Sequence, residues 1–249
     1  MKTIGFMYSC FKEKKAIEYS IKELRKHYPD SPIRLFSDGG ADFSYLESEY
    51  KNLKTSLEED TMSETFKITA GPTGCDHING NFRQEHYQNV IKKSAFATLD
   101  RIEKAIQYCN TDWIVMMDPD TLVRGKLSIP DDATLLGTLV NCCFPEDFQN
   151  IFKEIEGAKV LTSWGASPCV FEAKTFIKAL SFFKDHKYLF DKFSKEYFGM
   201  YAHDILIPVL FALIGEEEKF NSDIIECGRH RTWQNTSHPL VHQFEEYYE

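Results

Sequence analysis

Five apolar residues run directly into two carboxylates at residues 113–120, where the sequence reads WIVMMDPD. An apolar run of this length is typical of a strand buried on both faces of a parallel sheet. In open α/β sheets, ligands bind beyond the carboxyl ends of the strands, which is where Asp118 and Asp120 are expected. Residues i and i+2 of an extended chain point to the same side, so this pair is suited to bind one divalent cation through its oxygens.

Amphipathic patterns on either side of this strand predict an α/β fold. Apolar residues recur at helical spacing over residues 17–28 and again over 91–109. The first helix lies between the expected strands Ile4–Tyr8 and Ile33–Phe36, and this β-α-β order predicts a parallel pair of strands. The second helix ends just before Trp113. We therefore expect a central, mainly parallel sheet flanked by helices, in a single domain of residues 1–249.

The rest of the chain is less regular. Residues 41–80 suggest only a strand near 65–69, followed by glycine-rich turns. Beyond the central strand we expect a strand at 135–140, a helix opening at Pro145, a close-packed loop at 164–168, a helix from about Lys174, and an apolar helix that contains Pro208 and ends at Gly215.

Composition excludes several classes of protein. The net charge of −9 argues against a nucleic-acid-binding surface, because phosphate backbones attract basic faces. The longest apolar stretch, residues 205–214, is far shorter than the roughly 20 residues of a membrane helix. The seven cysteines include no Cys-x-x-Cys spacing, so neither a disulfide framework nor a zinc site is expected. The N-terminus lacks the pattern of a signal peptide, which favours a cytoplasmic protein.

Candidate donor-site residues cluster at the ends of the first two expected strands. Tyr8 and Ser9 end the first strand, and Asp38 follows the second. Asp38 could accept a hydrogen bond from a base or a ribose, although a turn-forming Asp before two glycines is nearly as good an explanation. Lys93, which we place in the first turn of the helix near Ile91, could meet a phosphate, and a solvated lysine is the alternative.

The second half supplies further candidates. Trp164 and Gly165 combine a flat aromatic ring with a small residue, which suits a loop beside a ligand or a plain tight loop. His203 and Asp204 precede the apolar helix, where Asp204 is by default an N-cap and alternatively a general base. Three histidines near the end of the chain are candidate metal ligands, namely His230, His238 and His242.

Taken together, these pieces resemble glycosyltransferases of the GT-A fold, which use nucleotide-sugar donors. Asp118-Pro119-Asp120 is similar to their Asp-x-Asp signature, and the first β-α-β unit to their nucleotide-binding half. Trp164-Gly165-Ala166 resembles their acceptor loop, and His203-Asp204 matches the place of the catalytic base in inverting members. Leu240-Val241-His242-Gln243 is similar to the late histidine that completes metal coordination in several members.

The resemblance implies a nucleotide-sugar-binding half at residues 1–125 and an acceptor-binding half at 126–249. It implies that Asp118, Asp120 and His242 bind Mn²⁺ or Mg²⁺, and that Asp204 is the catalytic base. The resemblance further implies a nucleoside-diphosphate sugar as the donor, with UDP preferred, and a hydroxyl of a glycan or glycoprotein as the acceptor. The short chain also resembles small glycosyltransferases of large DNA viruses, which would place it in the host cytoplasm. Whether transfer inverts or retains configuration stays open, as does the sugar.

Two alternatives are weighed against this interpretation. A haloacid-dehalogenase-like phosphatase also places two aspartates after an apolar strand, but it needs Thr or Val two residues after the second Asp, where this chain has Leu122. Its motif also lies near the start of the chain. A non-catalytic nucleotide or sugar binder, in which the two aspartates only cap a turn, is the second alternative. Manganese-dependent binding of a nucleoside diphosphate would favour the transferase over both.

Overall fold

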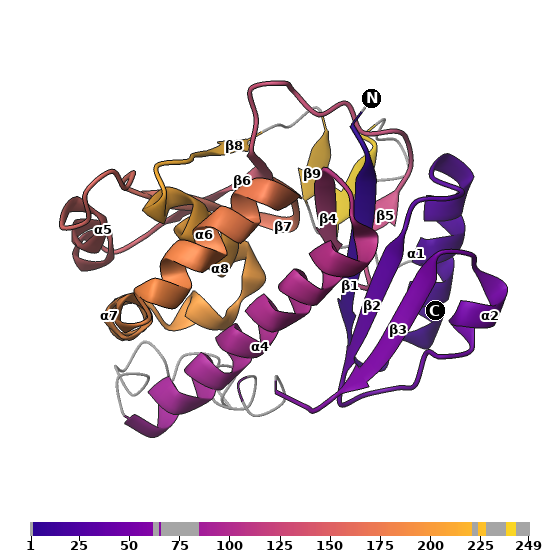
Figure 1. Cartoon of the computed structure of the whole chain (residues 1–249), viewed down its shortest axis with the longest axis horizontal. Helices are drawn as coiled ribbons and strands as arrows, with labels where there is room; N and C mark the ends of the chain where they lie inside the picture. Colours follow the sequence, from indigo (N-terminus) through magenta and orange to yellow (C-terminus); the bar gives the residue numbers. More distant parts are fainter. Residues whose placement is uncertain (1, 62–64, 66–84, 221–223, 228–237, 243–249) are drawn as a thin grey trace.

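The computed structural model describes residues 2–61, 65, 85–220, 224–227 and 238–242. These residues form an α/β fold around one large sheet (Figure 1). Its strands and those of a smaller sheet are β1 (Ile4–Cys10), β2 (Ile33–Asp38), β3 (Leu53–Glu58), β4 (Trp113–Met117), β5 (Leu122–Val123), β6 (Leu135–Cys143), β7 (Ser163–Glu172), β8 (Glu218–Phe220), β9 (Ile225–Cys227) and β10 (Leu240–His242). The helices are α1 (Lys14–His27), α2 (Leu46–Glu49), α4 (Glu85–Cys109), α5 (Glu146–Lys153), α6 (Ala173–Asp185), α7 (Tyr188–Glu196), the 3₁₀ helix η3 (Phe198–Tyr201) and α8 (His203–Leu213).

The large sheet is mainly parallel, as the sequence predicts. Its seven strands are ordered β3-β2-β1-β4-β7-β6-β8. β1 pairs in parallel with β2 and β4, β2 with β3, and β6 with β8. β7 pairs antiparallel with both of its neighbours, β4 and β6. In this sheet β7 therefore runs against the other six strands, whose carboxyl ends lie along one edge.

The predicted β-α-β unit at the N-terminus is confirmed as β1-α1-β2, with Tyr8 paired to Leu35 in parallel register. The turn after β2 uses glycine as expected, because Gly39 has a φ of +67°, which side chains rarely adopt. The predicted central strand is also confirmed. β4 is buried along its whole length, between β1 on one side and the antiparallel β7 on the other.

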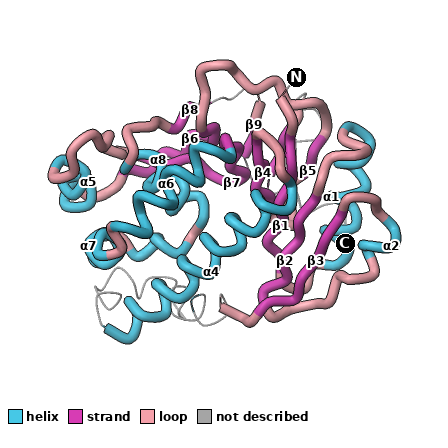
Figure 2. Tube along the Cα trace, viewed as in Figure 1, coloured by secondary structure: helices cyan, strands magenta, loops and turns pink. Residues whose placement is uncertain are grey.

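Two hydrophobic clusters cover the two faces of the sheet. On one face, α4, α6, α7 and α8 pack over Met7, Ile114 and Met116, and Figure 2 shows these helices gathered on one side of the strands. On the other face, α1 packs over Phe6 and Val115, together with residues of the smaller sheet. That sheet is ordered β5-β10-β9. Neighbouring residues of β4 thus face opposite clusters, as expected for an extended strand.

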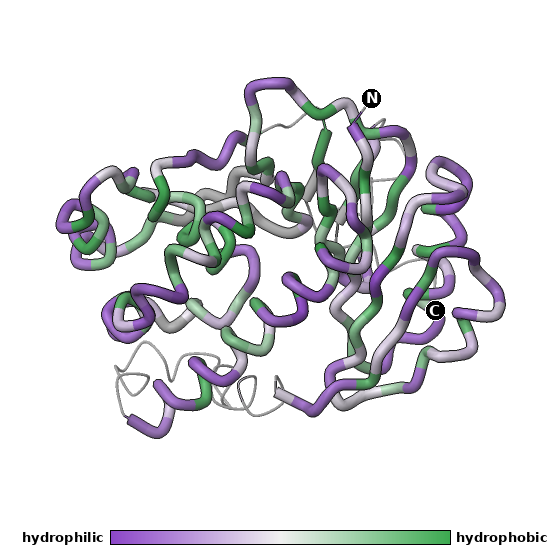
Figure 3. Tube along the Cα trace, viewed as in Figure 1, coloured by the Kyte–Doolittle hydropathy of each residue, from purple (hydrophilic) through white to green (hydrophobic). Residues whose placement is uncertain are grey.

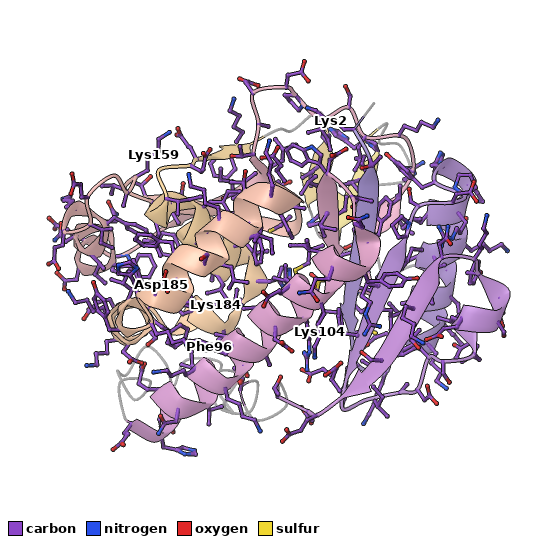
Figure 4. All side chains as sticks on the ribbon, viewed as in Figure 1. Lys2, Phe96, Lys104, Lys159, Lys184 and Asp185 are labelled. Carbon is purple, nitrogen blue, oxygen red and sulfur yellow. The ribbon has the colours of Figure 1, made fainter. Side chains whose placement is uncertain are left out.

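α4 is tied to the helices beside it. Phe96 packs against Phe183 of α6 and Phe190 of α7, at centroid distances of 6.0 and 5.6 Å (Figure 4). Lys184 of α6 forms an ion pair of 2.7 Å with Glu103. Figure 3 shows hydrophilic and hydrophobic stretches alternating along α4, as expected for a helix with one buried face.

The segment after β2 differs from the prediction. The expected strand near 65–69 lies almost wholly outside the described residues, and Thr65 itself is helical. The strand that does form is β3, which was not predicted because its buried and exposed residues do not alternate cleanly at the edge of the sheet. α4 begins at Glu85, six residues before Ile91, where Gln88 donates a hydrogen bond to the carbonyl oxygen of Ser194. Lys93 therefore lies more than two turns inside the helix, and its predicted place in the first turn is wrong.

Two predictions about the second half are also wrong or incomplete. The expected loop at 164–168 is part of β7. α7 was not predicted at all. The remaining expected elements are confirmed as β6, α5, α6 and α8, and Gly215 ends the last of these with a φ of +83°. Among the cysteines whose side chains the structure describes, four are free thiols, of which Cys10, Cys109 and Cys169 are buried and Cys143 is exposed. No helix among the described residues has both the length and the hydropathy needed to cross a bilayer.

Candidate functional site

The two aspartates lie in a tight turn at the carboxyl end of β4. The backbone N–H of Thr121 donates to the carbonyl oxygen of Asp118 at 3.1 Å, and the N–H of Asp118 donates to Oγ1 of Thr121 at 3.2 Å. Asp118, Pro119 and Asp120 are half-buried, whereas Thr121 is fully buried. Because the turn is closed from both ends, both carboxylates are held at the edge where six strands end.

A buried hydrogen-bond chain supports this turn from below. Ser20 of α1 donates its hydroxyl to the carbonyl oxygen of Thr121 at 2.5 Å. The hydroxyl of Tyr8 lies 2.7 Å from the same serine oxygen. Since Ser20 has only one hydroxyl proton and gives it to Thr121, Tyr8 is the donor of the second bond. Burial raises the pKa of the Tyr8 phenol, which keeps it protonated.

Replacing Ser20 with alanine is expected to lower the free energy of unfolding by about 1–3 kcal/mol, because it leaves both the Tyr8 hydroxyl and the Thr121 carbonyl buried without this partner. Tyr8→Phe is the matched control. It removes the terminal hydroxyl and keeps the bond from Ser20 to Thr121, so it should lower the free energy of unfolding by less than Ser20→Ala does. Urea denaturation of both variants measures the difference, and equal losses would show that the chain does not support the turn.

α8 brings His203 and Asp204 to the same place. Nε2 of His203 lies 3.9 Å from Oδ2 of Asp118, and both side chains are largely buried. The helix begins at His203 with Ala202 at the N-cap position and no side-chain capping bond. The default interpretation of Asp204 as an N-cap is therefore wrong. Asp204 is half-buried in the first turn, where the positive end of the helix dipole favours a carboxylate.

The backbone of His242 also reaches this turn. β10 pairs antiparallel with β5, Leu240 opposite Val123 and Val241 opposite Leu122. Continuing this register by one residue places His242 beside Thr121. The side chain of His242 lies outside the described part of the structure, as does all of His230. Among described side chains, no group of three His, Cys, Asp or Glu residues is arranged to hold a metal ion. A third ligand from His242 therefore stays a prediction.

The predicted donor residues are placed differently from one another. Tyr8 is fully buried and bonded to Ser20, so we leave it out of the proposed donor site. Asp38 is buried in an ion pair of 2.6 Å with Arg101 of α4. Ser9 is half-buried near the end of β1. Lys93 is exposed on α4 and forms an ion pair of 2.9 Å with Glu59.

Of the predicted acceptor residues, His203 lies beside Asp118, and the other two lie on β7. The N–H of Gly165 donates to Oε2 of Glu218 at 2.9 Å. The ring of Trp164 is not among the described side chains, so its predicted contact with a ligand is untested.

Sequence reasoning missed two buried charged groups, Arg101 and Glu218. Arg101 follows Ser94 and Thr98 at spacings of four and three, and all three are buried, so a polar stripe beside the apolar one was a usable signal. Glu218 gave no signal, because it ends a run of three glutamates that reads as a solvated surface. It is nevertheless only 5% exposed.

The fold and the site together define an α/β protein with an acidic centre at the carboxyl edge of a parallel sheet. No protein-family model matches the chain, and no curated protein sequence matches it. Among solved structures, a crystal structure of the galactosyltransferase LgtC in complex with donor and acceptor sugar analogues is similar over 97% of this chain and 87% of that chain. The TM-score is 0.45 and the sequence identity is 12%, and a likeness this distant carries no argument about activity.

Proposed function

We propose that this protein is a metal-dependent glycosyltransferase, which moves a sugar from a nucleoside-diphosphate sugar to a hydroxyl group of a glycan or glycoprotein. The observation that carries the proposal is the meeting of the Asp118 turn with the first turn of α8 at the carboxyl edge of the sheet. Ligands of open α/β sheets bind at this edge. A cation-binding pair of acids beside a histidine and a further acid suits a reaction in which a diphosphate leaves and a hydroxyl loses its proton.

The residues of the turn fit a hard divalent cation. Asp118 and Asp120 offer carboxylate oxygens from a turn that backbone and side-chain hydrogen bonds hold closed, and Mg²⁺ and Mn²⁺ prefer such ligands. His242, whose backbone is next in register to Thr121, is the proposed third ligand. When bound, such a cation supplies the positive charge that neutralises a leaving diphosphate. It also offsets the acidity of the site, which would otherwise repel a dianionic donor.

Asp204 is the residue we assign to the acceptor hydroxyl. In an inverting transfer, the acceptor oxygen forms a bond to the anomeric carbon of the sugar while the bond from that carbon to the diphosphate breaks, and the diphosphate leaves with the electron pair. The hydroxyl proton passes to the Asp204 carboxylate. His203, which precedes this acid in the first turn of α8, lies 3.9 Å from Asp118 of the cation-binding turn.

A thermal-shift experiment tests the proposal. UDP is expected to raise the melting temperature in the presence of Mn²⁺, because ligand at about 100 times its dissociation constant stabilises the native state by about 2.7 kcal/mol. Neither UDP with EDTA nor UMP with Mn²⁺ should do so to the same extent, since both lack part of the diphosphate–metal contact. If no nucleoside diphosphate raises the melting temperature in a manganese-dependent way, the proposal is wrong.

A further inference from the structure

Glu218 is a buried carboxyl that the proposed mechanism does not use. It is the first residue of β8, and only 5% of it is exposed, although it directly follows Glu216 and Glu217. Its Oε2 accepts a hydrogen bond of 2.9 Å from the N–H of Gly165. Its Oε1 is buried and has no hydrogen-bond partner among the residues that the structure describes. Leaving such an oxygen unpaired costs free energy, so its retention needs an explanation.

Two glycines on neighbouring strands provide the space for this carboxyl. A Cβ atom on Gly137 of β6 or on Gly165 of β7 would collide with Oε1 of Glu218. Neither glycine has a positive φ, so it is this close approach that requires them. The side chain thus lies flat on two strands at a point where both lack side chains.

The pairing of β6 with β7 is irregular at the same place. The register shifts between Leu136 and Thr138, and again between Leu139 and Cys143, while Gly165 is the partner of Leu139 between the two shifts. Irregularities of this kind redirect the strand and are common beside active sites. Glu218 therefore supplies a side-chain acceptor for an amide of β7 where the regular ladder is interrupted.

The surroundings of Glu218 are acidic. Burial raises the pKa of its carboxyl to about 8, and the negative charge of Asp204 on α8 adds to this effect, whereas the bond from Gly165 opposes it. Burial also raises the pKa of the Cys169 thiol, and the charges of Glu218, Asp204 and Asp118 raise it further. Glu216 bonds to Thr134 and Glu217 pairs with Lys159, so both are directed elsewhere.

We propose that Glu218 is a positioning residue, which holds the stretch of β7 with Trp164 and Gly165 in place in the strand against which α8, the helix of Asp204, packs. The role in catalysis rests on the proposed function, because this stretch is then the acceptor side of the site. Glu218 acts through the Gly165 amide and does not itself touch the reacting atoms. A neutral acid suits this task, because a charged one would repel Asp204.

The first test does not depend on activity. In protein labelled with ¹⁵N-glycine, the amide signal of Gly165, assigned by its loss in Gly165→Ala, should shift with pH around a midpoint near pH 8, the pKa of its partner. Glu218→Gln keeps an acceptor for the amide but cannot ionise, so the shift should disappear. Glu217→Gln is the matched control and should behave as the wild type, because Glu217 is an exposed neighbour that pairs with Lys159. Lys159 is labelled in Figure 4.

The second test measures hydrolysis of a UDP-sugar with Mn²⁺. In the wild type the rate should fall above about pH 8 as Glu218 ionises. In Glu218→Gln the rate at pH 7 should be kept, and this alkaline decline should vanish. Gly137→Ala, which displaces Oε1, should lower kcat at least about tenfold with unchanged affinity for Mn²⁺–UDP, since a small misplacement near a reacting group can cost about 100-fold.

These outcomes separate the two proposals. A Gly165 signal that titrates equally in Glu218→Gln, or a wild-type kcat in Gly137→Ala, would overturn the positioning role. If the wild type neither binds Mn²⁺–UDP nor hydrolyses the sugar nucleotide, the proposed function fails instead. In that case the Gly165 signal alone decides whether Glu218 holds this strand. A pH-independent Gly165 signal in the wild type would then reject the positioning role of Glu218.

Discussion

Replacing Asp118 with asparagine should weaken manganese-dependent binding of UDP at least about 100-fold. Mutating a residue that only hydrogen-bonds to a metal ligand already lowers metal affinity about 10- to 100-fold, and Asp118 is proposed as a ligand itself. Asparagine keeps the size of the side chain and the backbone bonds between residue 118 and Thr121. It removes one of the two negative charges by which the turn would attract a divalent cation. Isothermal titration calorimetry with UDP, with and without Mn²⁺, measures the loss.

The same variant should leave the fold intact. Asp118 is half-buried, and asparagine has nearly the same size, so the free energy of unfolding without ligand should change by less than about 0.5 kcal/mol. Asp147→Asn, an exposed change in the first turn of α5, is the control and should bind Mn²⁺–UDP normally. Asp120→Asn completes the set. Undiminished manganese-dependent affinity in both Asp118→Asn and Asp120→Asn would remove the metal site from the proposal.

The elements that could be predicted are those in which apolar residues form one continuous run or repeat at one regular spacing. β4 is an uninterrupted apolar run, and α1 and the second half of α4 each repeat their apolar residues at helical spacing, so burial alone determines their structure. From these elements the parallel pairing of the first two strands could be predicted, and so could the place of Asp118 at the carboxyl end of its strand. The carboxyl-edge position of the acidic pair was therefore accessible from the sequence.

The segments that could not be predicted are those in which tertiary contacts override the local pattern. Trp164 is followed by the small residues 165–167 and by Pro168, a pattern that favours a loop. These residues nevertheless extend β7, because β6 pairs along them and Glu218 accepts from Gly165. The start of α4 depends on the contact of Gln88 with Ser194, which lies 106 residues away. No local pattern contains this information.

The candidate site likewise combines features that the sequence predicts with features that depend on tertiary contacts. The sequence could identify His203 and Asp204 as candidates, but only the path of α8 across the sheet shows that His203 comes within 3.9 Å of Asp118. Asp38 is the opposite case. Its place after the second strand made it a candidate for contact with a nucleotide, and the structure shows its carboxylate bonded to Arg101 and to the backbone N–H of Thr61.

This buried pair leads to the second large prediction. Arg101→Met should lower the free energy of unfolding by about 3–5 kcal/mol, because it leaves the Asp38 carboxylate buried with its charge uncompensated. The two side chains are 4% and 5% exposed, and Nη2 of Arg101 lies 2.6 Å from Oδ1 of Asp38. Lys104→Met is the control on the same helix. Lys104 pairs with Asp100 at 2.7 Å, but its side chain is 44% exposed, so its loss should cost at most about 1 kcal/mol.

Combining Arg101→Met with Asp38→Asn should recover at least half of the lost stability, because the double variant buries no unpaired charge. The amide oxygen introduced at position 38 can still accept from the N–H of Thr61, which lies 2.9 Å from the carboxylate in the wild type. Urea denaturation of the single and double variants measures this coupling. The double variant also decides what Asp38 does. If the acid serves only to hold α4 against β2, Mn²⁺–UDP affinity should match the wild type once stability is restored, whereas a loss of affinity would return Asp38 to the nucleotide site. A cost for Arg101→Met no larger than that for Lys104→Met would contradict the structural role, since an exposed ion pair and a buried one would then be equivalent.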